Sequence, residues 1–578
     1  MGGGRLKKYV QYIKPYAAYY FTGPLFMLVE VVGDIMLPWL LARIINVGVM
    51  NHDIGYIVRT GIMMVIIAVF MAVGGVGGAF FAARAAMNTG TDLRMALFEK
   101  IQKFSFKNID DFSTGSLVTR LTNDITQIQN MIMQTLRTCL RSPGILIGAV
   151  IMAFVMSPGL AMILIVVIPV IVCVVAVIMK LAFPRFDRMQ TKLDNLNSCI
   201  QEMLVNIRVI KSFVRGEYEE AKFDSRNEQL CESTVRAMRT VIVMAPAMAL
   251  IMNMAIVAVM WKGGNMIIAG HMPVGNLTAF INYMTQILSS LTMLSMVFLN
   301  STRAVASLKR IDEVMQADID LTDDDAAMKD KKVLCGDVEF KNVFFRYYKN
   351  SEEWVLDNIS FHLKSGQKMG IIGSTGCGKS TLVSLIARLY DADSGSVLID
   401  GTDVREYSLK NLRDGVGMVL QNNVLFSGDI ADNLRWGDAD ATDEQIRQAA
   451  SAAQADEFVN DFADGYAAQL GQGGCNVSGG QKQRLCIARA LLKKPKILIL
   501  DDSTSAVDTA TERKINAALE EQLAGCTTIT VSQRISSIMH ADVILVMDNG
   551  RVIDMGTHEQ LLAGCTLYRE IYDLQTNS

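Results

Sequence analysis

One glycine-rich segment of this 578-residue chain has residue types suited to phosphate chemistry. It follows an apolar run at Met369–Ile372 and precedes a helical pattern. Its residues are Gly373, Ser374, Thr375, Gly376, Cys377, Gly378, Lys379, Ser380 and Thr381. Glycines allow backbone N–H groups to surround phosphates, a lysine reaches the β- and γ-phosphates, and a serine hydroxyl binds Mg²⁺. The segment therefore predicts a nucleoside triphosphate site, with Lys379 on the phosphates and Ser380 on the metal ion.

Two adjacent acids follow a second apolar run. Residues Ile497–Asp501 predict a buried parallel strand that ends in a carboxylate, and Asp502 comes next. At the carboxyl edge of such a sheet, Asp501 is expected beside the phosphate loop, where it can orient Mg²⁺. Together with the glycine-rich segment, this strand specifies a P-loop NTPase and nothing narrower.

A third motif narrows the family. Val477 precedes Ser478, Gly479, Gly480 and Gln481, and a helix is expected to begin near Lys482. This segment closely resembles the LSGGQ signature of ATP-binding cassette (ABC) proteins. Six apolar segments, described below, precede this single ATP-binding domain, or cassette. In this arrangement the chain resembles the half-transporters of the ABC exporter family over essentially its whole length. The resemblance implies that the amides of the signature serve the γ-phosphate of a nucleotide held by another subunit.

The same resemblance implies roles for three further residues. Tyr347 would stack on adenine, and Gln421 would contact Mg²⁺ and the attacking water. Asp508 would belong to a loop that crosses to the partner subunit. The segment 470–474 departs from the charged loop usual in exporters, because Gln472 and Gly473 replace it, so its contacts with the membrane domain are in doubt.

Two departures affect hydrolysis. Where the family has a glutamate that polarises water, this chain has Asp502, and where it has a switch histidine, this chain has Gln533. The aspartate is one methylene shorter, so its carboxylate stops roughly 1 to 1.5 Å short. A misplacement of about 1 Å can cost on the order of a hundredfold in rate. Gln533 cannot carry the charge of a protonated imidazole. We therefore expect ATP binding with impaired hydrolysis.

A partner with intact glutamate and histidine would give one weak site and one working site. The pattern is similar to that of the degenerate-site subunit of bacterial heterodimeric multidrug ABC exporters, which implies ATP and Mg²⁺ as ligands and a lipophilic or drug-like substrate. Two alternatives stay open: a homodimeric exporter with slow hydrolysis at Asp502, and an ATP-gated channel or sensor.

Six segments are apolar for long enough to cross a bilayer. They are approximately 17–45, 61–83, 136–156, 160–181, 241–260 and 277–299. The two long segments between spans, 84–137 and 180–239, are rich in Lys and Arg, which places them, the N-terminus and the cassette in the cytoplasm. The resemblance implies a bacterial inner membrane.

The predicted fold class is an all-α six-helix transmembrane domain with long cytoplasmic helical extensions, followed by an α/β P-loop NTPase domain. The expected boundaries are a membrane domain at 1–316, a linker at 317–334 and a cassette at 335–578. Breaks near 111–116 and 208–217 suit short coupling helices, although ordinary surface turns explain them equally well.

Polar residues within the spans are candidates for a substrate pathway. Glu30 and Asp34 are four residues apart and share one helix face, and acids at membrane depth are costly unless they face a cavity or a partner. The alternative is simple pairing, for example with Arg43. Asn282 and Gln286 form a similar pair, for which hydrogen bonding between helices is the favoured role.

The composition gives no support for a nucleic-acid partner, a disulfide framework or a metal site built from cysteines. The formal net charge is −3, which favours no nucleic-acid partner. Ten cysteines are scattered singly, without a CxxC pair, so we expect reduced thiols and neither a disulfide framework nor a metal site. The 35 methionines weakly favour a lipophilic substrate, because thioethers adapt to varied apolar ligands.

Overall fold

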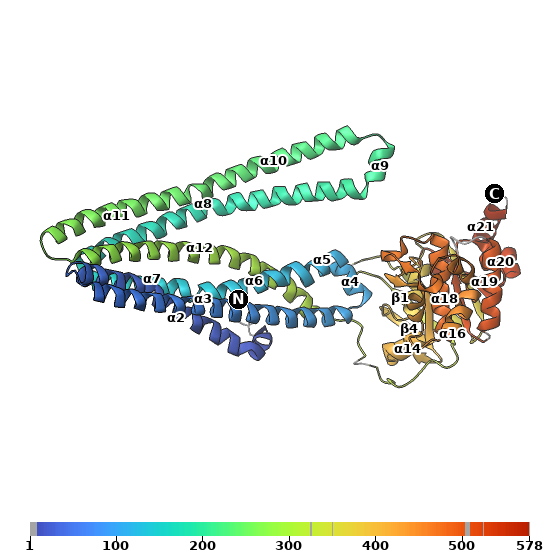
Figure 1. Ribbon diagram of the computed structural model, residues 1–578. Coiled ribbons are helices and arrows are strands. Elements are labelled where there is room, and N and C mark those ends of the chain that lie inside the picture. Colours follow the sequence, from blue (N-terminus) through green and yellow to red (C-terminus); the bar gives the residue numbers. More distant parts are fainter. Residues whose placement is uncertain (1–8, 324–325, 350, 503–508, 524, 577–578) are drawn as a thin grey trace. The chain divides into compact units, whose positions relative to one another are not determined.

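The computed structural model describes most of the chain. It covers residues 9–323, 326–349, 351–502, 509–523 and 525–576, without the side chains of 295–303, 509 and 520. Two compact units are present: Met1–Gln102 with Gly115–Gln316, and Lys103–Thr114 with Ala317–Ser578. Figure 1 draws the helices and strands of both units.

The first unit is helical. Its elements are η1 (Lys14–Tyr16), α2 (Ala17–Arg43), η2 (Ile44–Val49), α3 (Ile54–Gln102), α5 (Thr114–Thr119), η3 (Arg120–Asp124), α6 (Ile125–Thr138), α7 (Arg141–Met156), α8 (Pro158–Val205), α9 (Ile207–Ser212), α10 (Gly216–Ile242), α11 (Met244–Ile268) and α12 (Val274–Gln316). Helices α8 and α10 pair along their length and form an arm that ends at α9 (Figure 1). The short helix α9 thus occupies the second predicted break.

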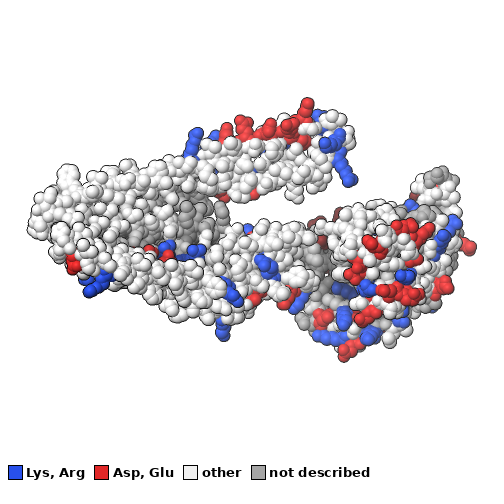
Figure 2. Space-filling view, in the orientation of Figure 1, with Lys and Arg blue, Asp and Glu red and all other residues white. Residues whose placement is uncertain are grey.

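Five helical stretches among the described residues are long and apolar enough to cross a membrane. They are Tyr9–Val49, Ile54–Gln102, Thr114–Met156, Pro158–Val205 and Gly216–Ile268. The predicted sixth span, 277–299, lies within α12. Figure 2 shows few charged side chains over the end of the bundle formed by α7, α8 and α11, whereas acids gather along α10. This distribution suits helices that pass from lipid into water.

Glycines allow α2 and α3 to pack closely. A Cβ atom added at Gly74 of α3 would lie 2.9 Å from the carbonyl oxygen of Phe26, on α2. One turn later, a Cβ atom at Gly78 would lie 3.2 Å from the carbonyl oxygen of Gly23. Small residues at such spacing let helix backbones approach inside a membrane.

The second unit contains two main sheets. A six-stranded sheet has the order β12-β11-β3-β10-β9-β6, in which only β12 pairs antiparallel, and a four-stranded antiparallel sheet has the order β2-β1-β4-β5. The strands are β1 (Val338–Phe345), β2 (Leu356–Leu363), β3 (Lys368–Gly373), β4 (Ser394–Ile399), β5 (Thr402–Asp403), β6 (Val416–Val419), β9 (Ile497–Asp501), β10 (Thr527–Val531), β11 (Val543–Asp548) and β12 (Arg551–Gly556), with β7 (Gly428–Asp429) and β8 (Gln469–Leu470) as a separate pair. This α/β unit follows the helical unit, as the sequence predicts.

Helices cover the sheets. They are α13 (Lys379–Ile386), α14 (Leu409–Gly415), α15 (Ile430–Arg435), α16 (Asp443–Ala452), α17 (Asp456–Asn460), α18 (Gly479–Leu492), α19 (Thr509–Gln522), α20 (His558–Gly564) and α21 (Thr566–Thr576), with 3₁₀ turns η4 (Val404–Glu406), η5 (Gly465–Ala467), η6 (Gln472–Gly474) and η7 (Ile535–Ser537). Strand β3 lies inside the parallel sheet and leads directly into the glycine-rich segment.

The segment 103–114 groups with the cassette, although the sequence places it in the membrane domain at 1–316. It forms α4 (Phe106–Phe112), which begins at a Ser105 capping box and ends before the residues 113–116 of the predicted break. Asn108 Nδ2 donates to the carbonyl oxygen of Asp318 at 3.0 Å, and Tyr390 Oη donates to Asp110 Oδ2 at 3.3 Å. These long-range contacts, which no local pattern encodes, attach α4 to the cassette.

Candidate nucleotide site

A cavity of about 440 Å³ lies at the end of β3 and β9. Its lining comprises Tyr347, Val355, Thr375, Gly376, Gly378, Lys379, Ser380, Thr381, Gln421, Asp501, Asp502, Val531, Ser532 and Gln533. Most of the predicted site residues therefore come together, from segments up to 186 positions apart, Tyr347 to Gln533. Val355, Val531 and Ser532 are three further lining residues that the sequence did not indicate, because none of them belongs to a phosphate-binding motif.

The glycine-rich segment forms a tight loop between β3 and α13. Gly378 caps the N-terminus of α13 with a φ of 96°, and a Cβ atom there would lie 2.8 Å from the carbonyl oxygen of Val355. Only glycine adopts this conformation without strain. Lys379 Nζ donates to the carbonyl oxygens of Gly373 and Ser374, both at 2.8 Å, so the ammonium lies over the loop. Cys377 is buried beneath the loop and does not line the cavity.

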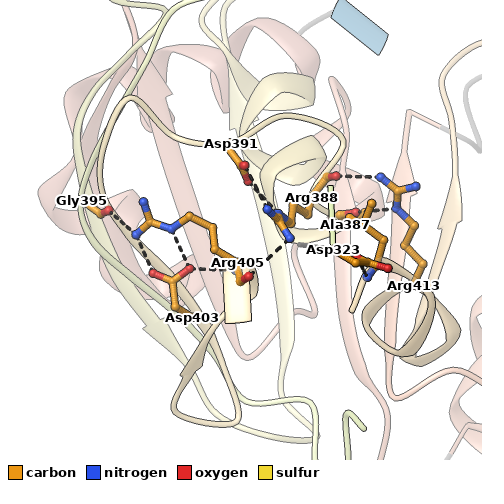
Figure 3. Close-up of polar contacts among 9 residues, drawn as sticks. Asp323, Ala387, Arg388, Asp391, Gly395, Asp403, Arg405 and Arg413 are labelled. Atoms are coloured by element: carbon orange, nitrogen blue, oxygen red, sulfur yellow. Dashed lines mark hydrogen bonds and ion pairs between the residues drawn. The ribbon is translucent and has the colours of Figure 1, made fainter. Parts of the chain in front are cut away.

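Arginines hold the opposite end of α13 (Figure 3). Arg413 donates to the carbonyl oxygens of Ala387 and Arg388, at 3.2 and 2.8 Å. Arg388 is itself buried and pairs with Asp391 through two hydrogen bonds of 2.8 and 3.2 Å. Cations near the last carbonyls stabilise a helix and satisfy its free acceptors. The helix that presents the phosphate loop is thus fixed at both ends.

Ser380 and Asp501 form a candidate metal pair. Ser380 Oγ donates to Asp501 Oδ1 at 3.1 Å, and Gln421 lines the same cavity. Hydroxyl, carboxylate and amide oxygens are the ligands that Mg²⁺ accepts, so the donor set fits this ion. Burial raises the pKa of Asp501, and the charge of Asp502 adds to the effect. A bound divalent cation would favour the ionised carboxylate.

Asp502 and Gln533 face each other. Gln533 Nε2 donates to Asp502 Oδ2 at 3.3 Å, and Asp502 lies in the left-handed region with a φ of 48°. The backbone N–H of Asp502 donates to the carbonyl oxygen of Val531 at 2.9 Å, which ties it to the end of β10. Burial also raises the pKa of Asp502, although Lys379 and Arg534 oppose the shift. The two departures from the family pattern therefore occupy one corner of the cavity.

The predicted signature lies elsewhere on the same unit. Ser478 caps α18, where its hydroxyl accepts from the backbone N–H of Gln481 at 3.3 Å while Gln481 Oε1 accepts from the N–H of Ser478 at 2.8 Å. Helix α18 begins at Gly479, three residues before the predicted start, because this capping box recruits both glycines into the first turn. Ser478 and Gly479 are exposed, and neither they nor Gly480 line the cavity.

Tyr347 stands at the rim of the cavity. Its hydroxyl lies 2.8 Å from Thr381 Oγ1, and its ring contacts Phe345 and Tyr390 edge-on, with centroids 5.0 and 5.2 Å apart. Asp508 lies outside the described residues.

The acids of the first span meet a residue that the sequence did not suggest. Arg141 Nη2, on α7, lies 2.9 Å from Glu30 Oε1 and 3.4 Å from Asp34 Oδ2. Arg43, the suggested partner, instead lies over the ring of Trp39, 4.2 Å from its centroid. Glu30 and Arg141 line a cavity of about 890 Å³ between the helices. Its other walls include Met27, Met71, Met133, Arg137 and Met293.

The two residues of the second polar pair, Asn282 and Gln286, make different kinds of hydrogen bond. Gln286 Nε2, on α12, donates to the carbonyl oxygen of Asp34 at 2.8 Å and so links α12 to α2. Asn282 Nδ2 donates to the carbonyl oxygen of Thr278, within its own helix, at 3.0 Å. The expected bond between helices is therefore made by Gln286, whereas Asn282 bonds locally.

Comparison with known protein families matches both parts of the chain. Residues 20–291 match the ABC transporter transmembrane region, and residues 356–505 match the ABC transporter family. The chain is 39% identical over 570 residues to the Bacillus subtilis ABC transporter ATP-binding protein YfiB, covering 99% of this chain and 98% of that protein.

Two further relatives carry functional descriptions of their own. A putative multidrug export ATP-binding/permease protein of Bacillus subtilis is 33% identical, with 99% of each chain covered. The ATP-dependent lipid A-core flippase of Pseudomonas aeruginosa is 32% identical, covering 89% of this chain and 84% of that protein.

A solved bacterial Atm1-family ABC exporter with ATP bound has a similar fold. The TM-score is 0.82 at 25% identity, and the match covers 97% of this chain and 98% of that one. With the phosphate loop, the acid-ended strand and the capped signature helix in place behind a helical membrane unit, the chain belongs to the ABC transporters, as an exporter that fuses a transmembrane domain to an ATP-binding domain.

Proposed function

We propose that this chain is one subunit of a heterodimeric exporter, in which its own phosphate loop forms a site that binds ATP and hydrolyses it poorly. The observation that carries the proposal is the pairing of Asp502 with Gln533 beside the phosphate loop, at 3.3 Å. In this corner a working site needs a longer carboxylate and an imidazole. Neither substitution removes a group that binds the nucleotide, because Lys379, Ser380 and Tyr347 all line the same cavity.

The expected loss falls on the chemical step. A base misplaced by about 1 Å costs on the order of 3 kcal/mol, or a hundredfold in rate. The side-chain N–H group of Gln533 still donates a hydrogen bond to the γ-phosphate of ATP, but it supplies neither the charge nor the proton of an imidazolium. ATP would therefore stay bound through several cycles and keep the two cassettes in contact.

The signature supports the second half of the proposal. Ser478 and Gly479 are exposed at the N-terminus of α18, which suits them to the γ-phosphate of a nucleotide on another subunit. The competent site would then combine a partner's phosphate loop with this signature. Hydrolysis there would drive the membrane helices between inward-facing and outward-facing states, because ATP binds the two states with different affinities.

The membrane cavity supports a lipophilic substrate with a polar group. Methionine side chains from α2, α3, α6 and α12 form adaptable apolar walls, and Glu30 and Arg141 place opposite charges on one side. Charged side chains within membrane spans face the interior of the bundle and not the lipid, and they often mark a substrate path. We place the transporter in a bacterial inner membrane, with the N-terminus and cassette in the cytoplasm.

The test is ATPase activity of the full-length chain, purified alone and with the half-transporter encoded beside it. Each preparation is compared with the variant Asp502→Glu plus Gln533→His. We expect the lone chain to be nearly inactive, the pair to be active, and the double substitution to raise hydrolysis by the lone chain. The exposed pair Asp440→Glu plus Gln448→His repeats both chemical changes away from the cavity and serves as the control.

Other results identify the alternatives. A lone chain that turns over several times per second as a stable dimer would show that Asp502 is a working base in a homodimer. Ion conductance that follows ATP binding, without sensitivity to vanadate, would indicate an ATP-gated channel.

A further inference from the structure

The C-terminal helix α21 holds the loop that carries Gln533. Gln575 Nε2 donates to the carbonyl oxygen of Gln533 at 2.7 Å, and Gln575 Oε1 accepts from the backbone N–H of Ile535 at 2.9 Å. Both backbone groups belong to the turn that runs from the end of β10 into the first residue of η7. Because one amide uses its donor and its acceptor on the same turn, it sets the orientation of the turn as well as its position.

Helix α21 is itself firmly placed. Tyr568 is fully buried, and Ile571 and Tyr572 are partly buried beside it, packed with side chains of β3, β11 and η7. Positions 568, 571, 572 and 575 follow the spacing of a single helix face. Gln575 is itself exposed, but it lies one turn beyond this packed stripe on the same face of α21, and it reaches the loop from there.

Gln575 binds the backbone of Gln533, and the side chain of this same residue extends into the nucleotide site. It lines the nucleotide cavity and donates to Asp502 Oδ2. Gln533 is an exposed residue, whereas Ile535 is buried two residues later. A rotation of this turn would carry the Gln533 amide away from the phosphate end of the cavity.

We propose that Gln575 is a positioning residue that fixes the Gln533 turn, so that the Gln533 amide stays where the γ-phosphate of ATP binds. The C-terminal helix is thereby part of the nucleotide site. This inference rests on the proposed contact of Gln533 with the γ-phosphate.

The test compares nucleotides with and without that phosphate on the full-length chain. Gln575→Leu keeps the size of the side chain and removes both hydrogen bonds. Binding of ATPγS is expected to weaken about fivefold, because a hydrogen bond to a charged group is lost in part, whereas binding of ADP is unchanged. Asp573→Leu places the same residue on the opposite, exposed face of α21 and should change neither affinity. Equal weakening of both nucleotides would indicate a general structural defect and overturn the proposal.

The variant Gln533→Ala distinguishes the contact of Gln533 with the γ-phosphate from the positioning role of Gln575. If this variant weakens ATPγS and Gln575→Leu has no further effect in its background, Gln575 acts through Gln533 as proposed. If Gln533→Ala weakens ATPγS but Gln575→Leu alone does not, the positioning role is wrong while the proposed function stands. If Gln533→Ala has no effect, Gln533 does not contact the γ-phosphate, and both that part of the proposed function and this inference fail.

Discussion

Asp501 and Asp502 are neighbours in the chain, yet their surroundings assign them different chemistry. Asp501 is 4% exposed and accepts a hydrogen bond from Ser380, as a metal ligand would, whereas Asp502 is half-buried and meets Gln533. Burial raises the pKa of both carboxyls, because removing a carboxylate from water disfavours its charge. The ionised pair is therefore costly until a cation joins it.

That cost predicts a stabilising substitution. With its pKa raised, the folded chain binds the Asp501 proton more tightly than the unfolded chain does, so stability falls as pH rises through the raised value. Asp501→Asn removes this loss. We expect a higher unfolding temperature than wild type at pH 7 without nucleotide, a difference that shrinks as pH is lowered toward the ordinary pKa of an aspartate, and loss of Mg²⁺-dependent ATP binding. An unfolding temperature below wild type at pH 7 would contradict the burial argument.

At the scale of elements, close packing of α2 on α3 positions the membrane cavity. Gly74 and Gly78 bring the backbones together, and the carboxylate of Glu30 lies over Gly75, where a Cβ atom would come within 3.3 Å of Oε2. Periodicity predicts the two helices, but not which face of α3 receives α2. The role of the glycines on α3, which is to allow close packing, becomes clear only when the pairing of α3 with α2 is known.

The pairing predicts a contrast between two glycines of α3. Gly74→Val places a branched side chain against the backbone of Phe26, and overpacking of this kind costs about 1–3 kcal/mol. Gly61→Val is the matched control, since a Cβ atom there has no neighbour within 4 Å. Thermal unfolding of the purified chain in detergent should show a lower midpoint for the first variant only. Equal midpoints would mean that α2 and α3 are not packed at Gly74.

At the scale of the whole molecule, the arm of α8 and α10 presents an apolar tip. Phe213 and Val214, directly after α9, are 73% and 88% exposed. Large apolar side chains gathered at an exposed turn are typical of a surface that meets a partner. We interpret this tip as a contact with the second subunit.

Assembly tests that interpretation. Phe213→Asp should reduce both co-purification with the proposed partner half-transporter and the ATPase activity of the pair, while ATP affinity of the chain stays unchanged. Ser225→Asp introduces the same charge at an exposed polar position of α10 and should leave assembly intact. Normal assembly and activity of Phe213→Asp would exclude the tip from the interface.

The sequence by itself determined the parts that depend on near neighbours: the phosphate loop, the acid-ended strand, the signature motif, the apolar spans and the two departures at Asp502 and Gln533. Only the tertiary structure decided contacts between distant positions. Arg141 pairs with Asp34 across 107 positions, and Tyr390 binds Asp110 of α4 across 280. Gln575 reaches Gln533 across 42. Hydrophobic periodicity and short motifs arise from local backbone geometry, whereas such pairings depend on how whole elements pack, and no single segment carries that information.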